Sequence, residues 1–362
     1  MSAETSLTRR RLLAGAAAAA LAGPGARAQG FAGMGAEAAE FAQVVPGAAL
    51  DFPRDHLAHP GFRIEWWYVT ANLRAADGTR LGVQWTLFRT AFEPGDTDLG
   101  AGWDSPQLWF AHAAITTAET HRAEERFARG GIGQAGVTAP PFRAWIDDWA
   151  LEGAPGPGDL YDRLSMRARG ASFAFALDMA AEGPLVLHGE EGFSLKSERG
   201  QASYYYSQPF YRVRGSVTLD GEETQVEGRA WLDREWSSQP LDETQTGWDW
   251  FSLSFDDGDK AMLYRIRQAD GDTFSGTWIG ADGATAQIAR ADIAFTPLDW
   301  ADVAGRETPV RWRVEIAGRG VEIEVAALNP RAWNALTVSY WEGPVIMTGT
   351  HPGEGYLEMT GY

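Results

Sequence analysis

The chain has 362 residues, no cysteine, 16 tryptophans and a formal net charge of −18 at pH 7. Without cysteine, neither a disulfide nor a thiolate metal site can form. The strong negative charge excludes a nucleic-acid partner, because phosphates would be repelled. The sequence has no Walker loop, dinucleotide fingerprint or Gly-x-Ser-x-Gly elbow, so we expect no cofactor and no metal.

The first 28 residues have the three parts of a bacterial signal peptide. Arg9, Arg10 and Arg11 form a basic start, an apolar stretch runs to Ala22, and Ala26-Arg27-Ala28 is a cleavage motif. The paired arginines indicate the twin-arginine type, with an ordinary Sec signal as the alternative. We therefore predict that residues 1–28 are a cleaved signal and that the protein is periplasmic or secreted. No later run of about 18 apolar residues predicts a membrane span.

A hairpin pattern follows, and it occurs twice. An Asp-Gly turn at 77–78 lies midway between Glu65 and Arg89, and another at 257–258 lies midway between Asp249 and Arg265. Asp-Gly between alternating apolar runs is typical of a β-hairpin. In each hairpin the acid then lies opposite the base, on a face that is otherwise apolar. The repetition predicts two related β-domains.

Further strand patterns, separated by turns rich in Gly and Pro, predict an all-β protein with two antiparallel domains. We place a lead-in at 29–50, an N-terminal domain at 51–228 and a C-terminal domain at 229–362. Strand periodicity alone does not separate closed barrels from sandwiches. The stretch 118–129 is the best candidate for a helix.

The densest group of chemically active residues runs from 231 to 236. In an extended strand, Asp233 and Glu235 share one face at a spacing of about 7 Å, whereas Arg234 and Trp236 share the other. Two such carboxyl groups can divide acid and base roles if burial raises one pKa. A structural ion-pair cluster is the alternative interpretation.

Other candidates are single residues. His112, in a strand-like run, is either a proton carrier near neutral pH or a core histidine. Tyr206, in a run of three tyrosines, either lines a cavity or packs with its hydroxyl at water. Asp55, His56 and His59 form a loose cluster that gives only weak support for a metal site, because no further histidine-rich segment supplies a fourth ligand.

Five ordered aromatic motifs resemble the lipocalin-like family that joins the AttH proteins, described as secreted hydrolases, with the carotenoid 1,2-hydratases. The motifs are at 59–68, 202–207, 228–236, 247–251 and 355–362, within a match from about residue 51 to the end. The resemblance implies two lipocalin-like antiparallel β-barrels packed together, with an apolar ligand channel.

The hydratase branch of this family protonates an alkene without a cofactor, and water then captures the cation. Such chemistry needs an acid in a dry, aromatic tunnel. That branch usually has a His at the position of Arg234 and an Asp soon after the position of Tyr264, so this chain is more similar to the exported AttH-like branch. If the chain is an enzyme, we expect Asp233 and Glu235 to be the acid and base and Tyr264 to relay protons.

The leading hypothesis is therefore an exported protein that binds a long apolar lipid or isoprenoid and carries, hydrates or hydrolyses it. The residues expected at the ligand are Glu65, Trp66, Arg89, His112, Tyr206, Trp236, Trp250 and Arg265. A rival hypothesis is carbohydrate binding or glycoside cleavage, which needs tryptophans in an open groove rather than in an enclosed apolar cavity. A third is an accessory role with an envelope transporter, which needs an exposed apolar patch.

Overall fold

The computed structural model describes residues 40–95, 102–197, 200–239 and 244–362. The predicted signal at 1–28 and most of the lead-in lie outside these residues. The described part of the lead-in packs on the N-terminal half, where Phe41 is buried and the Val45 amide donates to the Tyr204 hydroxyl. In the described residues, no helix is long and apolar enough to cross a membrane.

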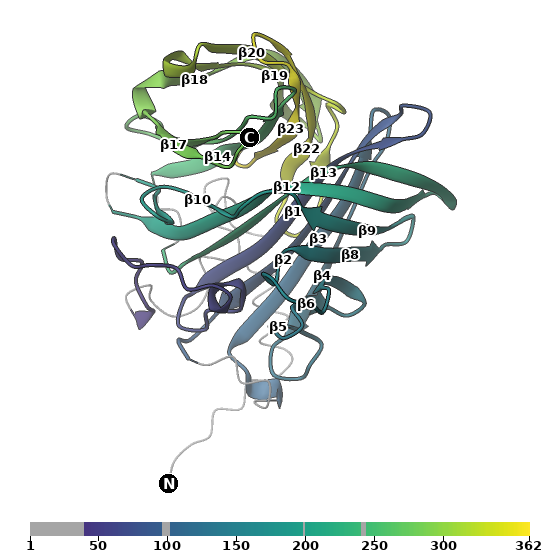
Figure 1. Cartoon of the computed structure of the whole chain (residues 1–362), viewed down its shortest axis with the longest axis vertical. Coiled ribbons are helices and arrows are strands. Elements are labelled where there is room, and N and C mark those ends of the chain that lie inside the picture. Colours follow the sequence, from purple (N-terminus) through teal and green to yellow (C-terminus); the bar gives the residue numbers. More distant parts are fainter. Residues whose placement is uncertain (1–39, 96–101, 198–199, 240–243) are drawn as a thin grey trace.

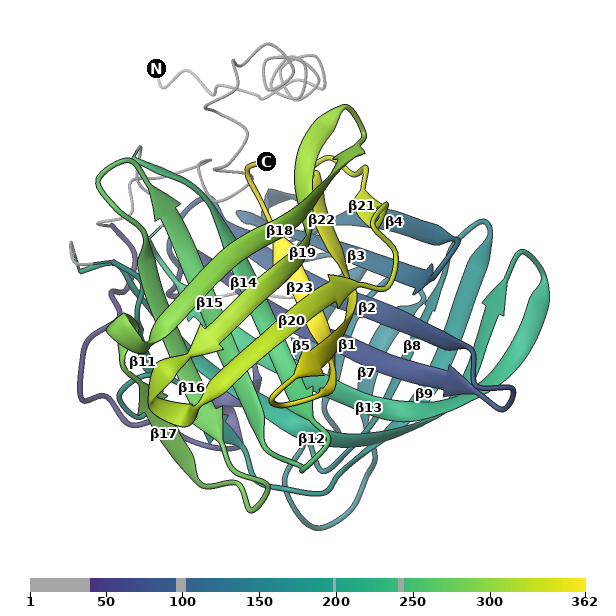
Figure 2. The same cartoon turned by 90° about the horizontal axis from the view of Figure 1, so that it is seen from above.

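The described residues confirm the all-β prediction, because the helical elements among them are only short 3-10 turns. These turns are η4 (Arg54–His56), η5 (Gly102–Asp104), η6 (Arg290–Asp292) and η7 (Ala317–Arg319). Two antiparallel sheets hold the strands, and each sheet curls around an apolar core (Figures 1 and 2).

The first sheet has thirteen strands among the described residues and is curled around its core, and we call it the N-terminal barrel. Its strands are β1 (Ile64–Ala75), β2 (Arg80–Ala91), β3 (Gln107–Thr117), β4 (His121–Arg129), β5 (Ala135–Thr138), β6 (Arg143–Ile146), β7 (Trp149–Gly153), β8 (Arg163–Arg169), β9 (Phe173–Ala181), β10 (Val186–Leu187), β11 (Phe193–Leu195), β12 (Ala202–Leu219) and β13 (Glu222–Ser237).

The second sheet has ten described strands and is also curled, and we call it the C-terminal barrel (Figure 1). Its strands are β14 (Gln245–Phe255), β15 (Lys260–Gln268), β16 (Thr273–Ile279), β17 (Thr285–Ile288), β18 (Ile293–Val303), β19 (Arg306–Ile316), β20 (Val321–Ala327), β21 (Trp333–Asn334), β22 (Tyr340–Gly349) and β23 (Gly353–Met359).

The two sheets share one topology. The first has the order β4-β3-β2-β1-β13-β12-β9-β8-β7-β6-β5, and the second has the order β17-β16-β15-β14-β23-β22-β20-β19-β18. In both, the first four strands form a meander, and the last strand of the domain returns to pair with the first. In both, a short extra strand also pairs with the penultimate strand, β12 or β22. This shared order agrees with a duplicated ancestral unit.

The hairpin registers agree with the sequence prediction. Glu65 lies opposite Arg89 in the β1–β2 hairpin, and Asp249 lies opposite Arg265 in the β14–β15 hairpin. The alternate residues that share a face with each acid, such as Trp67 and Phe251, belong to the two apolar cores. Both barrels are therefore filled by side chains, and neither core is a hollow container.

The helix predicted at 118–129 is wrong. Most of the segment forms β4, which pairs with β3. Arg129 lies opposite Leu108 at one end of this pairing, and His121 lies opposite Thr116 at the other. Its Ala, Glu and Arg residues favour a helix in isolation, but strand pairing at the sheet edge overrides that weak preference.

The boundary predicted at 228/229 also differs from the sheet arrangement. It falls inside β13, which pairs with β1 on one side and with β12 on the other. The motif at 231–236 therefore completes the N-terminal barrel, because its backbone hydrogen bonds go to that sheet. The second sheet begins at Gln245.

Candidate functional site

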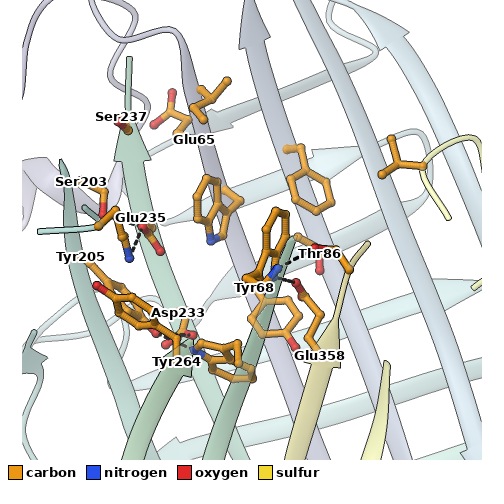
Figure 3. A pocket seen from close by; sticks show the side chains of 18 of the residues that line it. Glu65, Tyr68, Thr86, Ser203, Tyr205, Asp233, Glu235, Ser237, Tyr264 and Glu358 are labelled. Carbon is orange, nitrogen blue, oxygen red and sulfur yellow. Dashed lines mark hydrogen bonds and ion pairs between the residues drawn. The ribbon is translucent and has the colours of Figure 1, made fainter. Parts of the chain in front are cut away.

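A cavity of about 310 Å³ lies between the two barrels (Figure 3). Successive side chains of a strand point to opposite faces, so β1 sends Trp67 into its barrel core and Trp66 and Tyr68 outward to the cavity. Aromatic rings from both barrels make up much of the wall. These are Trp66, Tyr68, Phe88, Phe110, Tyr205, Trp248, Trp250, Tyr264 and Tyr340. The apolar channel implied by the family resemblance is thus an interface between barrels.

The cavity wall repeats in the two halves. Trp66 pairs with Phe88 and Glu235 in the N-terminal barrel. In the same register, Trp250 pairs with Tyr264 and Glu358 in the C-terminal barrel. The two outward faces are therefore equivalent surfaces of the duplicated unit, packed against each other around the cavity.

Asp233 is held in place by three hydrogen-bond donors. The Tyr205 hydroxyl donates at 2.8 Å to Oδ2, while Trp231 Nε1 at 2.6 Å and the Ser207 hydroxyl donate to Oδ1. Burial raises the pKa of Asp233 to about 7, with the charge of Glu235 adding to the effect and the three donors opposing it. Asp233 is 3% exposed, so its carboxyl group is largely protonated below neutral pH and ionised above it.

Glu235 lies beside Asp233 on the outward face of β13, as the strand alternation predicts. Its Oε1 accepts a hydrogen bond from the Ser203 hydroxyl and lies 2.8 Å from Lys196 Nζ. The ammonium group of Lys196 also lies over the rings of Tyr205 and Tyr264. Glu235 thus has a cationic partner and a hydroxyl donor inside the cavity.

Tyr264 lines the cavity, but its hydroxyl donates to the Leu195 carbonyl at 2.7 Å. Its proton is therefore already in a hydrogen bond to the backbone. The geometry gives Tyr264 a positioning role beside Lys196 and offers no direct contact to Asp233.

A second acid, which the sequence analysis did not single out, comes from β23. Glu358 lines the cavity and accepts a hydrogen bond from Trp248 Nε1 at 2.6 Å. Burial raises its pKa to about 7, opposed by the Trp248 bond and reinforced by the negative charges of Asp233 and Glu235. The duplication could have revealed it, because Glu358 occupies the position of Glu235.

His112 lies in the cavity wall on β3. Its Nδ1 is 2.9 Å from the Tyr340 hydroxyl of the other barrel, and its Nε2 has no hydrogen-bond partner among the described residues. Burial lowers the pKa of His112 to about 3, so the ring is neutral at physiological pH. His112 is thus a polar contact point and not a carrier of charge.

Glu65 and Arg89 border the cavity, but their charges are used elsewhere. Both side chains are fully buried and paired with each other, and Arg234 and His59 bind the same carboxylate. Burial alone would raise the pKa of Glu65, but Arg89, Arg234 and His59 lower it well below its usual range. We call these four residues the barrel-end cluster.

The remaining expected ligand residues lie away from the cavity. Trp236 is in the N-terminal core, stacked on His59, and Tyr206 hydrogen-bonds His56 there. Arg265 binds Asp249 and lies over the ring of Trp312 in the C-terminal core. Strand alternation explains why Trp236 points into the barrel core: Asp233 and Glu235 occupy the other face of β13, which lines the cavity. In the described residues, no group of His, Asp or Glu side chains, including Asp55 and His59, is arranged to hold a metal ion.

The fold and site define a class: a protein of two related β-barrels with an aromatic-lined cavity between their outward faces. The AttH-like family model matches residues 43–362. The chain therefore belongs to the AttH-like family.

Solved structures extend this comparison. An AttH protein from Nitrosomonas europaea is 35% identical, with a TM-score of 0.78 over 89% of this chain and 100% of that one. Kievitone hydratase from Nectria haematococca has a TM-score of 0.65 at 16% identity, covering 89% of this chain and 96% of that one. CghA, solved with Sch210972, has a TM-score of 0.54 at 12% identity, and the match covers 92% of this chain and 97% of CghA. The last two show a shared fold alone. No curated protein matches the chain.

Proposed function

We propose that this chain binds an apolar small molecule in the cavity between its barrels and adds water to it by acid–base chemistry. The proposal includes export, so the protein would act in the bacterial periplasm or outside the cell. The ligand class is a lipid or isoprenoid with a carbon–carbon double bond or a hydrolysable bond. The observation that carries the proposal is the placing of two carboxyl groups with pKa values about 7, Asp233 and Glu358, in an aromatic cavity.

Three features of the cavity support acid chemistry on an apolar ligand. A carboxyl group with a pKa near the working pH can both give and recover a proton. Aromatic faces such as those of Trp66 and Trp250 stabilise a developing positive charge. A mainly apolar wall limits the water near a cation, so that capture by water is controlled by position. The kievitone hydratase fold, named for a hydration, is consistent with this use of two barrels.

The carbohydrate hypothesis fits less well. A sugar site presents tryptophan rings in an open groove, whereas Trp66, Trp248 and Trp250 line the space between the barrels. The transporter hypothesis needs a contiguous exposed apolar face. The exposed large apolar side chains in the described residues belong to separate segments: Val45, Trp103, Phe127, Leu195 and Trp300.

Two measurements test the proposed function. Mass spectrometry of an organic extract from the purified native protein should find a bound lipid or isoprenoid. The neutral fluorophore 1-aminoanthracene should bind in the cavity, and Trp66→Ala should weaken its binding about tenfold. Trp103→Ala is the matched control, because Trp103 is 72% exposed and lies outside the cavity. A clean extract, no fluorophore binding and affinity for oligosaccharides would contradict the proposal.

A further inference from the structure

Besides Glu65, which is bound in the barrel-end cluster, three carboxyl groups line the cavity, and they are bound very differently. Asp233 is almost inaccessible and accepts three hydrogen bonds. Glu235 is 6% exposed and is paired with Lys196 and Ser203. Glu358 is only half-buried, and Trp248 is its single hydrogen-bond donor in the described part of the chain. Of the three, Glu358 is therefore the carboxyl group that a ligand can reach.

The position of Glu358 also suits contact with a ligand. Figure 3 shows Asp233, Glu235 and Glu358 around the same space, with Tyr68 and Thr86 close to Glu358. Trp248 donates to Oε1, which leaves Oε2 for a proton or a ligand. A carboxylic acid with one oxygen anchored and the other open has a fixed direction for proton transfer.

The charges around the cavity favour an uncharged ligand. The two cations that line it among the described residues, Lys196 and Arg89, are each paired with a carboxylate. A ligand carboxylate would find no free cation there and would face the negative charges of Asp233 and Glu235. A neutral alkene needs no cation, and the aromatic faces and the carboxyl group of Glu358 are open to it.

We propose that Glu358 is the residue that exchanges a proton with the ligand, that the ligand is an uncharged alkene, and that Asp233 is a positioning residue. This inference rests on the proposed function. Asp233 is anchored by Tyr205, Trp231 and Ser207. Burial raises the pKa of Glu358, and the charge that Asp233 carries when ionised adds to that effect.

The step balances with water as the only co-reactant. The O–H bond of Glu358 breaks as its proton goes to one alkene carbon, and the π electrons form the new C–H bond. The other carbon becomes a cation, and a water oxygen forms the new C–O bond to it. The proton that this water releases returns to the Glu358 carboxylate, so the acid is restored.

An apolar diazo reagent tests which carboxyl group can deliver a proton inside the cavity. With 9-anthryldiazomethane, the carboxyl proton moves to the diazo carbon, the carboxylate oxygen then bonds to that carbon, and nitrogen leaves. We expect the full chain at pH 7 to be esterified at Glu358, at least tenfold more than at Asp233 or Glu235, as mapped by peptide mass spectrometry. This mapping needs no variant and so does not depend on a variant folding.

Variants separate direct contact from an indirect role. Glu358→Gln should abolish the cavity label, whereas Glu354→Gln should keep it, because Glu354 is paired with Arg74 outside the cavity. Asp233→Asn should leave the label on Glu358 but shift its pH midpoint to lower pH, because a neighbouring negative charge is lost. If Asp233 had only a structural role, Asp233→Asn would leave the pH midpoint of Glu358 labelling unchanged.

Label on Asp233 or Glu235 in place of Glu358 would overturn the inference. A cavity that binds 1-aminoanthracene but takes no label would also overturn it and leave the proposed function standing. Failure of 1-aminoanthracene to bind would overturn the proposed function itself, and this inference with it.

Discussion

Two groups of buried carboxylates lie on neighbouring strands and behave in opposite ways. In the barrel-end cluster, Glu65 on β1 is fully buried and is bound by two arginines, and its pKa is lowered. On β13, three residues before Trp236, which lies opposite Glu65, Asp233 is also buried. Its hydrogen-bond donors are neutral, and burial raises its pKa to about 7. Burial is nearly equal in the two groups, so the difference comes from the charge of the partners.

This contrast distinguishes buried carboxyl groups that have a structural role from those that can take part in proton transfer. A carboxylate with cationic partners holds its charge and fixes the chain around it. A carboxyl group buried without a cation titrates near neutral pH and can move a proton. Within the cavity, the same contrast separates Glu235, paired with Lys196, from Glu358, which has no cation.

The largest expected effect is in the barrel-end cluster. Arg89→Ala removes one of the two arginine partners of Glu65 and also the donor to the buried Gln107 and to the carbonyls of His59 and Phe62. We expect the free energy of unfolding at pH 7 to fall by about 3–5 kcal/mol, because buried groups are left unpaired. Denaturant unfolding monitored by tryptophan fluorescence measures this change in the free energy of unfolding.

The duplicated position and a surface position provide controls. Arg265→Ala should cost less than Arg89→Ala, because Arg89 is fully buried and also donates to Gln107 and two backbone carbonyls, whereas the Arg265 side chain is 11% exposed and binds mainly Asp249. Arg212→Ala should be near neutral, because Arg212 pairs with Glu182 at the surface. Equal losses for all three variants would show that the barrel-end cluster is not a special structural element.

The second prediction concerns Glu358 in the cavity, whose pKa is raised whereas that of Glu65 is lowered. The pKa of Glu358 is about 7 in the folded chain, above its ordinary 4.5, so the folded state binds more protons than the unfolded state between these pH values. Stability therefore falls as pH rises through this window. Glu358→Gln should raise the free energy of unfolding by about 1–2 kcal/mol at pH 8 and leave it unchanged at pH 4. A uniform change at both pH values would argue against a titrating Glu358.

The hairpins and their acid–base registers could be predicted from the sequence, because Asp-Gly turns and apolar alternation fix local pairing. The face shared by Asp233 and Glu235 followed from the same rule. The place of the cavity could not be predicted, since it depends on which outward faces of the two barrels meet. That docking involves residues such as Tyr68 and Glu342, which are 274 positions apart.

The predicted site residues fall into two groups, those that line the cavity and those that lie in the barrel cores. Trp66, Trp250 and His112 were identified and do line the cavity. Trp236 and Arg265 were expected at a ligand but lie in the barrel cores, because aromatic or charged character alone does not tell the face of a strand. Glu358 was missed because no charged partner in its own motif marked it.

The third prediction asks whether the charge partner alone separates Glu235 from Glu358. Lys196→Met keeps the length and apolar stem of the side chain but removes the ammonium group beside Glu235. We expect a loss of about 1–2 kcal/mol in the free energy of unfolding and new esterification of Glu235 by 9-anthryldiazomethane. Lys260→Met is the control, since Lys260 lies over Phe210 and outside the cavity. A Glu235 that stays unlabelled would mean that access, and not charge, protects it.

The smallest expected effect lies where the two barrels meet behind the cavity. The Tyr68 hydroxyl donates at 2.6 Å to Glu342 of the C-terminal barrel, which also accepts from Asn334. Burial and the charge of Glu358 raise the pKa of Glu342 well above its usual range. Tyr68→Phe should then cost about 1 kcal/mol.

A double-mutant cycle with Glu342→Gln isolates this interaction, and a coupling of about 1 kcal/mol is expected if the bond acts between the barrels. Because Tyr68 also packs edge-on against Trp250 across the same interface, its ring stays in place in the Phe variant. Binding of 1-aminoanthracene should therefore weaken less in Tyr68→Phe than in Trp66→Ala. A larger loss in Tyr68→Phe would mean that the hydroxyl, and not the aromatic wall, sets the position of one barrel on the other.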